Sequence, residues 1–284
     1  LPQIRAQVKA NAVTWDIVTP SSTDCARAAN EGLLEEIDYK TVDTKGIDPK
    51  LNNKFYVAND FYSLVLAWST VKYGANAPKS WADFFDTVKF PGRRSLPARP
   101  SGSLEVALLA DGVSFDKLYP LDVDRAFKKL EEIKPHVLIW WNSGAQSAQV
   151  LKDAEVDMVS AWNGRIQALQ SEPVGKAGAI AVSFDQQILV SDCWLIPKGA
   201  PNKDLALKAI AIMTRPEVNA RISLFINYAP ANAKSYDTGV IPKDKLPGLP
   251  NSPENVKKGF VMSVDWWVKN TDEMVKRFDA FLQK

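Results

Sequence analysis

One carboxylate stands inside an apolar run that is typical of a strand. Asp192 lies in the segment 188–196, whose other members are mostly aliphatic or aromatic. Burying an unpaired carboxylate is costly, so Asp192 needs a positively charged partner. That partner is either the ammonium group of a ligand or a lysine or arginine of the chain itself, and the sequence leaves both open.

Several turns that combine small residues with hydroxyl or amide side chains precede predicted helices. They contain Ser21 and Thr23, Ser101, Ser143 and Asn163. Backbone N–H groups at a helix N-terminus attract anions, and ligands of open α/β sheets gather where strands end in such turns. Each turn taken alone is an ordinary helix cap. Their number favours a binding surface for a small polar ligand.

Trp162 ends a predicted strand and is followed closely by Arg165. A tryptophan there can pack against a ligand or make a cation–π contact with an amine, and an arginine can hold a carboxylate in a bidentate fork. The alternatives are a core tryptophan and a solvated arginine at a helix start. The pair is therefore a candidate for one face of a ligand site.

The composition excludes several classes of protein. The chain has 35 basic and 33 acidic residues, hence a net charge of +2, which does not suit a strongly basic nucleic-acid binder. One histidine and two cysteines exclude zinc sites built on several such ligands. A serine hydrolase with a nucleophile at Ser21 or Ser101 would need His136 as its base. We expect no enzymatic activity, no bound metal and no cofactor.

The two cysteines, Cys25 and Cys193, are far apart in the sequence. They would be close if the turn before Cys25 and the strand around Asp192 faced one site. A disulfide between them would then close a long loop. Two buried free thiols are the alternative, and the sequence does not decide between them.

Strand-like and helix-like segments alternate along the chain, which predicts an α/β fold. The expected strands are Val13–Val18, Phe61–Ser69, Val137–Trp141, Val156–Trp162 and Gln186–Ile196. A last amphipathic helix is expected over Asp272–Leu282, with Val275, Phe278 and Phe281 on one face.

Segments in the same order along nearly the whole chain resemble the solute-binding proteins of ABC importers, and most closely the spermidine/putrescine-binding proteins and their relatives. These segments are Trp15–Ser22, Glu31–Asp38, Ser80–Phe85, Phe90–Arg94, Ala161–Arg165 and Ile196–Asn202. The resemblance implies a type II periplasmic binding protein, with two lobes, a cleft between them and two strands that cross at a hinge.

The lobe boundaries follow from the same resemblance. Residues 1–68 and 193–250 are expected to form lobe 1, and residues 69–192 lobe 2. Residues 251–284 are expected to form a helical segment that packs across both lobes. The strand, helix and second strand that open other family members are expected to be absent from this chain.

Functional residues carry over position by position. The resemblance implies that Ser21 and Thr23 are cleft residues of lobe 1, that Trp162 packs against the ligand, that Asp192 holds a ligand amine and that Tyr228 is a cleft tyrosine. Arg165, Ser101 and Ser143 are candidates for binding a carboxylate.

Two departures from the polyamine binders change the expected ligand. The turn 99–103 contains no acid, where polyamine binders hold their second amine, and Val190 replaces a cleft tryptophan. A ligand with one ammonium group and one carboxylate, such as γ-aminobutyrate, therefore fits better than a diamine. The alternatives are a polyamine or a metal ion, which relatives of this fold bind through tyrosine pairs and carboxylates.

The resemblance also predicts the setting of the protein. A small amine-bearing ligand and a permease in the inner membrane are the expected partners, without nucleic acid. The protein is expected to be a monomer that works in the periplasm.

Overall fold

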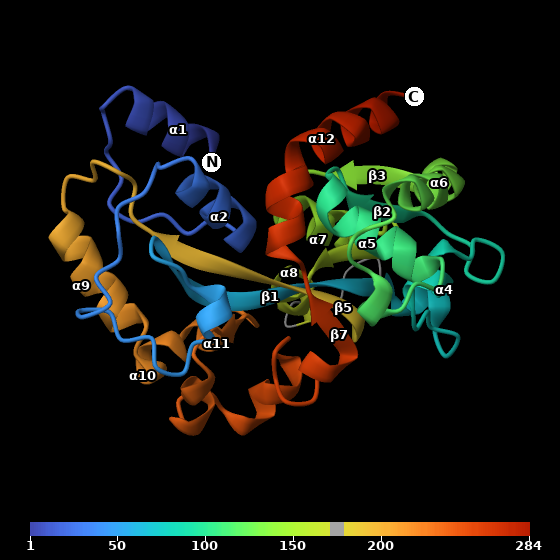
Figure 1. The fold of residues 1–284 in the computed structure, drawn as a ribbon. Coiled ribbons are helices and arrows are strands. Elements are labelled where there is room, and N and C mark those ends of the chain that lie inside the picture. The colour runs from blue at the N-terminus through green and yellow to red at the C-terminus, as the bar shows by residue number, and fades with distance from the viewer. Residues whose placement is uncertain (171–178) are drawn as a thin grey trace. The chain divides into compact units, whose positions relative to one another are not determined.

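The computed structural model describes residues 1–170 and 179–284, and their contacts divide the chain into two compact units (Figure 1). Unit 1 contains Leu1–Tyr62 and Val190–Ser252, and unit 2 contains Ser63–Leu189 and Pro253–Lys284. The division lies a few residues from the expected lobe boundaries. It groups the C-terminal segment with unit 2, where we expected a segment packed across both lobes. That these units act as lobes stays a prediction.

Unit 2 is built on a twisted sheet in which β2 lies between β3 and β4 and runs parallel to both. Strand β4 pairs on its other edge with β1 in the antiparallel sense, followed by β5 and then β7. The strand bounds are β1 Tyr56–Ser69, β2 Arg94–Pro97, β3 Val137–Trp141, β4 Met158–Trp162, β5 Ile180–Leu195, β6 Ala229–Pro230 and β7 Gly259–Val261.

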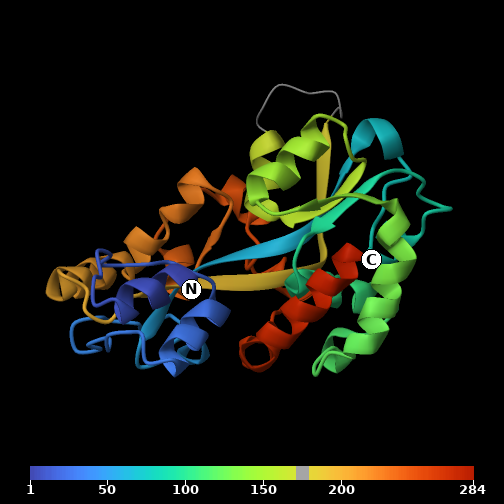
Figure 2. The same ribbon diagram turned by 90° about the horizontal axis from the view of Figure 1, so that it is seen from above.

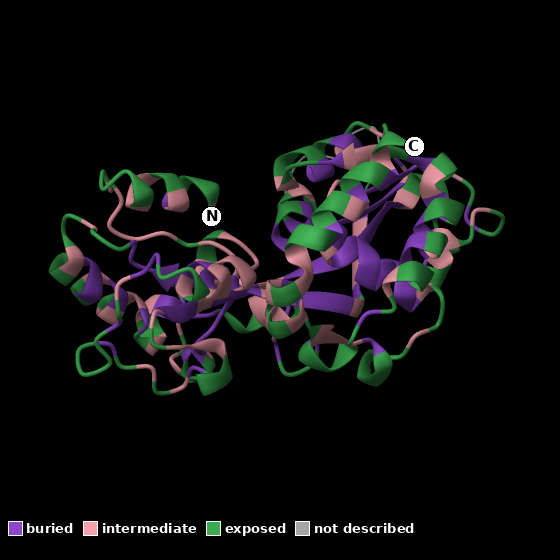
Figure 3. Cartoon of the chain, turned by 45° about the horizontal axis from the view of Figure 1, so that its top comes forward, coloured by how far each residue is buried: buried purple, intermediate pink, exposed green. Residues whose placement is uncertain are grey.

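Helices cover the sheet of unit 2, and its buried residues concentrate on the strands and on the inner helix faces (Figure 3). Helix α5 is apolar on nearly every side and is buried, whereas α6 is amphipathic and begins at the Asp122 cap. Helix α12 packs against α6 through Phe127, Phe278 and Phe281 (Figure 2). The bounds are α3 Thr70–Tyr73, α4 Trp81–Phe85, α5 Pro100–Ala110, α6 Val123–Ile133, α7 Gly144–Lys152, α8 Asn163–Gln170 and α12 Val264–Gln283.

Unit 1 has a smaller core, formed where α1 and α2 pack beside the end of β5. Ile4, Ala28, Leu34 and Leu195 are buried there together with the two cysteines. The strand β6 pairs with β1 at Asp60 and Phe61. The helices are α1 Pro2–Lys9, α2 Ser22–Asn30, α9 Lys203–Met213, α10 Pro216–Asn219 and α11 Ile222–Phe225.

Several expected elements differ from the structure. Strands β1 and β5 begin five and six residues earlier than expected, at Tyr56 and Ile180, and β4 begins two residues later, at Met158. The segment Val13–Val18 is not a strand, because only Val18 makes a bridge, to Leu195, while Trp15 and Val18 pack against the core of unit 1. The apolar character of this segment reflects its packing against the core and not pairing with a neighbouring strand.

The last helix begins at Val264 after the Ser263 cap, eight residues before the expected start. Val275 is 39% exposed, and the buried face carries Met274 with Phe278 and Phe281. The i, i+4, i+7 spacing of these three residues defines the stripe that faces the core.

Within the described ranges, no helix has both the length and the apolar character needed to cross a membrane.

Candidate ligand-binding groups in the two units

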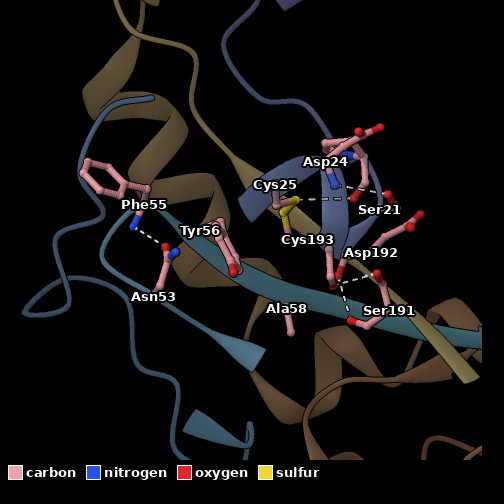
Figure 4. Close-up of a disulfide and its surroundings, with 12 residues drawn as sticks. Ser21, Asp24, Cys25, Asn53, Phe55, Tyr56, Ala58, Ser191, Asp192 and Cys193 are labelled. Carbon is pink, nitrogen blue, oxygen red and sulfur yellow. Dashed lines mark hydrogen bonds between the residues drawn. A yellow bond between two sulfur atoms is a disulfide. The ribbon is translucent and has the colours of Figure 1, made fainter. Parts of the chain in front are cut away.

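In unit 1, the start of α2 lies beside the end of β5 (Figure 4). Ser21 caps α2 by accepting a hydrogen bond from the Asp24 N–H, and its backbone forms a bridge with that of Asp192. A disulfide joins Cys25 of α2 to Cys193 of β5. The sequence left the bridge and two free thiols equally open, and the structure contains the bridge. The disulfide therefore holds the polar residues at the start of α2 next to Asp192 of β5.

Asp192 is partly buried and has a phenol as its neighbour. The Tyr62 hydroxyl donates a hydrogen bond to Asp192 Oδ1 at 3.0 Å. Burial raises the pKa of Asp192 to about 6; the Tyr62 hydrogen bond opposes the rise, and the charge of Asp24 adds to it. The sequence allowed a ligand ammonium group or a basic side chain as the partner of Asp192. Within residues 1–170 and 179–284, no basic side chain is among the groups that act on its charge.

A second carboxyl, that of Asp60, lies next to Asp192. Asp60 and Tyr62 are two residues apart on β1 and so point to the same face of the strand. The Asp192 N–H donates to the Asp60 carboxyl. Burial raises the pKa of Asp60 to about 8, and the charge of Asp192 contributes to the rise. We call Asp60, Asp192 and Tyr62 the acidic group of unit 1.

Tyr228, another expected residue of unit 1, contacts this group, and Thr23 lies on the neighbouring helix α2. Tyr228 stacks on Tyr62, with ring centroids 5.0 Å apart and an interplanar angle of 25°. Thr23 lies in the first turn of α2 and is half-buried. The aromatic pair forms an apolar wall against which the methylenes of a ligand could pack.

In unit 2, the carboxyl ends of β2, β3 and β4 meet at one edge of the sheet, because β2 runs parallel to both neighbours. The turns that follow these strands lead into α5, α7 and α8. This arrangement brings the expected residues Ser101, Ser143 and Trp162 to the same edge, as anticipated for helix starts in an open α/β sheet.

An arginine missed by the sequence analysis lies against two tryptophans at this edge. The guanidinium carbon of Arg99 is 4.6 Å from the ring centroid of Trp141 and 4.8 Å from that of Trp162. The two rings meet edge to face with centroids 5.9 Å apart. Trp162 is half-buried, so packing holds its ring in place while part of the ring remains exposed to solvent.

Arg165 is exposed in the first turn of α8 and lies beside the start of α7. A Cβ built on Gly144 would lie 3.0 Å from Trp162 Cδ1 and 3.2 Å from Arg165 Cγ. The Ser143 Oγ caps α7 through the Gln146 N–H. We call Trp162, Arg165 and Arg99 the tryptophan–arginine group of unit 2.

Ser101 differs from the other helix starts. Ser101 and Gly102 have non-helical backbone angles, so the regular part of α5 begins at Ser103. Ser101 is half-buried, and the Gly102 N–H donates to Glu105. One backbone donor of this turn is therefore already used inside the protein.

The eight expected residues thus divide equally, with Ser21, Thr23, Asp192 and Tyr228 in unit 1 and Ser101, Ser143, Trp162 and Arg165 in unit 2. Sequence reasoning missed Asp60, Tyr62 and Arg99. A carboxylate directly before the apolar run 61–69 was the available signal for Asp60, by the same argument that singled out Asp192.

A metal site of the ordinary kind does not form in the described ranges, where no three histidine, cysteine or acidic side chains come together in a suitable group.

Comparison with known proteins gives matches along the whole chain. The model of a family of bacterial extracellular solute-binding proteins matches residues 1–248. The chain is 36% identical to the gamma-aminobutyric acid-binding protein of Pseudomonas aeruginosa, over 99% of its own length and 79% of that protein. It is 27% identical to the spermidine/putrescine-binding periplasmic protein of Escherichia coli, over 86% of its own length and 71% of that protein.

Solved structures agree with these matches. An ABC transporter substrate-binding protein from Bradyrhizobium japonicum superposes with a TM-score of 0.94 at 43% identity, covering 99% of this chain and 87% of that one. The Atu4243-GABA receptor superposes with a TM-score of 0.89 at 39% identity, covering 99% of this chain and 85% of that one. The resemblance and the α/β periplasmic-binding-protein fold expected from the sequence are confirmed.

Proposed function

Because the chain belongs to the bacterial extracellular solute-binding proteins, we propose that it captures a small solute with one ammonium group and one carboxylate for an ABC importer. An ω-amino acid such as γ-aminobutyrate is the solute class. The observation that carries this proposal is the acidic group of unit 1, in which the partly buried Asp192 is influenced by Tyr62 and Asp24 and, among the described residues, by no basic side chain.

The ammonium end of the solute is assigned to Asp192. A carboxylate that is removed from water gains most from a charge-assisted hydrogen bond to a cation. The Tyr62 hydroxyl orients the carboxylate, because it occupies Oδ1 and leaves lone pairs for another donor. The stacked ring of Tyr228 is assigned to the methylene chain of the solute.

The carboxylate end is assigned to the tryptophan–arginine group of unit 2. Arg165 is exposed, and its planar guanidinium matches a carboxylate in a bidentate pair. The Ser143 and Ser101 helix starts are further candidates. A diamine is disfavoured at this end, because Arg99 and Arg165 place positive charge where a second ammonium group would need an acid.

The names of the relatives support this solute class. A protein named for γ-aminobutyrate is 36% identical over nearly the whole chain, against 27% for one named for spermidine and putrescine. Closing of two lobes on the solute, delivery to a permease of the inner membrane, work in the periplasm as a monomer, and the absence of catalysis belong to the same proposal.

Calorimetric titration with γ-aminobutyrate, putrescine and spermidine tests the function. We expect γ-aminobutyrate to bind most tightly. Butyrate, which lacks the ammonium group, and butylamine, which lacks the carboxylate, serve as matched control solutes and should bind weakly. Tight binding of a diamine without a response to γ-aminobutyrate would contradict the proposal, and a metal ion found by native mass spectrometry would favour the metal-binding alternative.

A further inference from the structure

Asp60 is a buried acid whose hydrogen-bonding capacity is incompletely used. Asp60 is only 4% exposed, and its Oδ1 is buried with no hydrogen-bond partner in the described part of the chain. The carboxyl does accept the Asp192 N–H, which engages one side of it. An ionised carboxylate in this position is costly unless a cation or a proton compensates it.

Another fully buried acid of the same chain provides a contrast. Glu105 in unit 2 accepts hydrogen bonds from the Tyr119 hydroxyl at 2.6 Å, the Trp267 indole N–H at 2.7 Å and the Gly102 N–H at 2.8 Å. These donors explain Glu105 as a structural acid that ties α12 to α5. The Asp60 oxygen that lacks such donors requires a different explanation.

Among the described residues, the groups that act on Asp60 and Asp192 are acidic or phenolic. Asp24 of α2 and Tyr62 of β1 act on Asp192, and Tyr228 stacks on Tyr62. The Asp192 N–H donates to the Asp60 carboxyl, and the charge of Asp192 acts on that carboxyl. Asp60 keeps its proton at neutral pH, because burial and the charge of Asp192 both oppose its ionisation.

We propose that Asp60 and Asp192 hold one proton between them in the solute-free protein and exchange it for the ammonium group of the solute. The balance is one ammonium group bound and one proton released to water, with no covalent bond made or broken in the solute. This inference rests on the proposed function, because it concerns the residue that receives the ammonium group. Asp60 acts in it as a positioning residue through Asp192.

The pair also explains a preference for cationic solutes. A neutral group that enters the site leaves the shared proton in place and gains no ion pair, whereas a cation replaces the proton and meets two carboxylates. Affinity for γ-aminobutyrate should therefore rise with pH, by up to about tenfold per pH unit where a whole proton is released.

Proton release is measurable by calorimetry in two buffers. Titration of γ-aminobutyrate at neutral pH in phosphate and in Tris, which differ in ionisation enthalpy, should give release of about one proton per solute in the unmodified protein. In Asp60→Asn the release should fall close to zero and the affinity should depend less on pH. Asp43→Asn, which removes an exposed carboxylate from the same unit, is the control and should release the proton as before.

A measurement without solute separates this inference from the proposed function. In protein labelled at the aspartate carboxyl carbons, the signal that is lost in Asp60→Asn should titrate well above the range of an ordinary aspartate. In Asp192→Asn the same signal should titrate at lower pH. An Asp60 signal that titrates normally overturns the inference, as does binding without proton release or with equal release in Asp60→Asn. Failure of γ-aminobutyrate to bind, with the Asp60 signal as expected, overturns the proposed solute and the exchange with it.

Discussion

The hydroxyl of Tyr62 donates to Asp192 while its ring stacks on Tyr228, so one side chain links the acid of β5 to the aromatic wall of unit 1. Tyr62 comes from β1, and Asp192 comes from β5, 130 residues later. The contact depends on the two strands being neighbours in the sheet.

Tyr62→Phe separates the two roles of this side chain. The ring and its stacking remain, whereas the hydrogen bond that lowers the pKa of Asp192 is lost. We expect the affinity for γ-aminobutyrate to fall by about 1–3 kcal/mol, with the larger loss below neutral pH, where more of Asp192 is protonated. Calorimetric titration at several pH values measures this. Tyr39→Phe removes a hydroxyl from unit 1 outside the acidic group and should leave the affinity unchanged; an equal loss in both variants would contradict the assignment.

Asp192→Asn tests the acid directly. The amide keeps the shape of the side chain but cannot neutralise an ammonium group, so the affinity for γ-aminobutyrate should fall by about 2–5 kcal/mol. Asp43→Asn is the matched control. An unchanged affinity in Asp192→Asn, with normal folding by circular dichroism, would show that Asp192 has a structural role only.

Gly144→Ala tests the tryptophan–arginine group without changing any charge. The added methyl would lie 3.0 Å from Trp162 and 3.2 Å from Arg165, and Trp162 is already held by Arg99 on its ring. We expect a several-fold loss of affinity for γ-aminobutyrate, with little change in melting temperature because alanine favours the helix. Ala145→Ser adds one atom at the neighbouring exposed position, and an equal loss of affinity there would contradict the proposed cause.

The stability of the protein should fall as pH rises through the range where Asp60 ionises. Burial raises the pKa of Asp60 from 3.8 to about 8, so the folded state retains a proton that the unfolded chain has released. The stabilisation is complete below about pH 4 and is lost toward pH 8, by about 6 kcal/mol at most. Guanidinium unfolding at several pH values should show a flatter profile for Asp60→Asn and greater stability than the unmodified protein at pH 8. A profile with the same slope in both proteins would contradict this.

Local elements were largely predictable from the sequence, whereas the partners of the site residues were not. The strand Val137–Trp141 has the bounds expected from its apolar run, and the Ser143 cap lies in one of the turns predicted to precede a helix. These features depend on neighbours within a few residues. The segment 13–18 shows the limit, because an apolar run does not specify whether a partner strand is available.

Asp60 and Arg99 show why the complete groups could not be predicted. Asp60 meets Asp192 only because β1 and β5 are adjacent in the sheet, and a single sequence does not specify which strands pair. Arg99, which follows β2, contacts both Trp141 and Trp162 because β2 lies between the two strands that end in them. The sequence identified Asp192 and Trp162. The order of the strands in the sheet determines that Asp60 and Arg99 lie beside them.

The disulfide between Cys25 and Cys193 has a practical consequence for laboratory work. It connects positions separated by 168 residues, and closing a loop of that size contributes about 2–5 kcal/mol. Material prepared in a reducing cytosol will lack this tether between α2 and the residue next to Asp192. A thiol assay should therefore precede every titration. Weak binding by protein that lacks the disulfide would otherwise be attributed to the choice of solute.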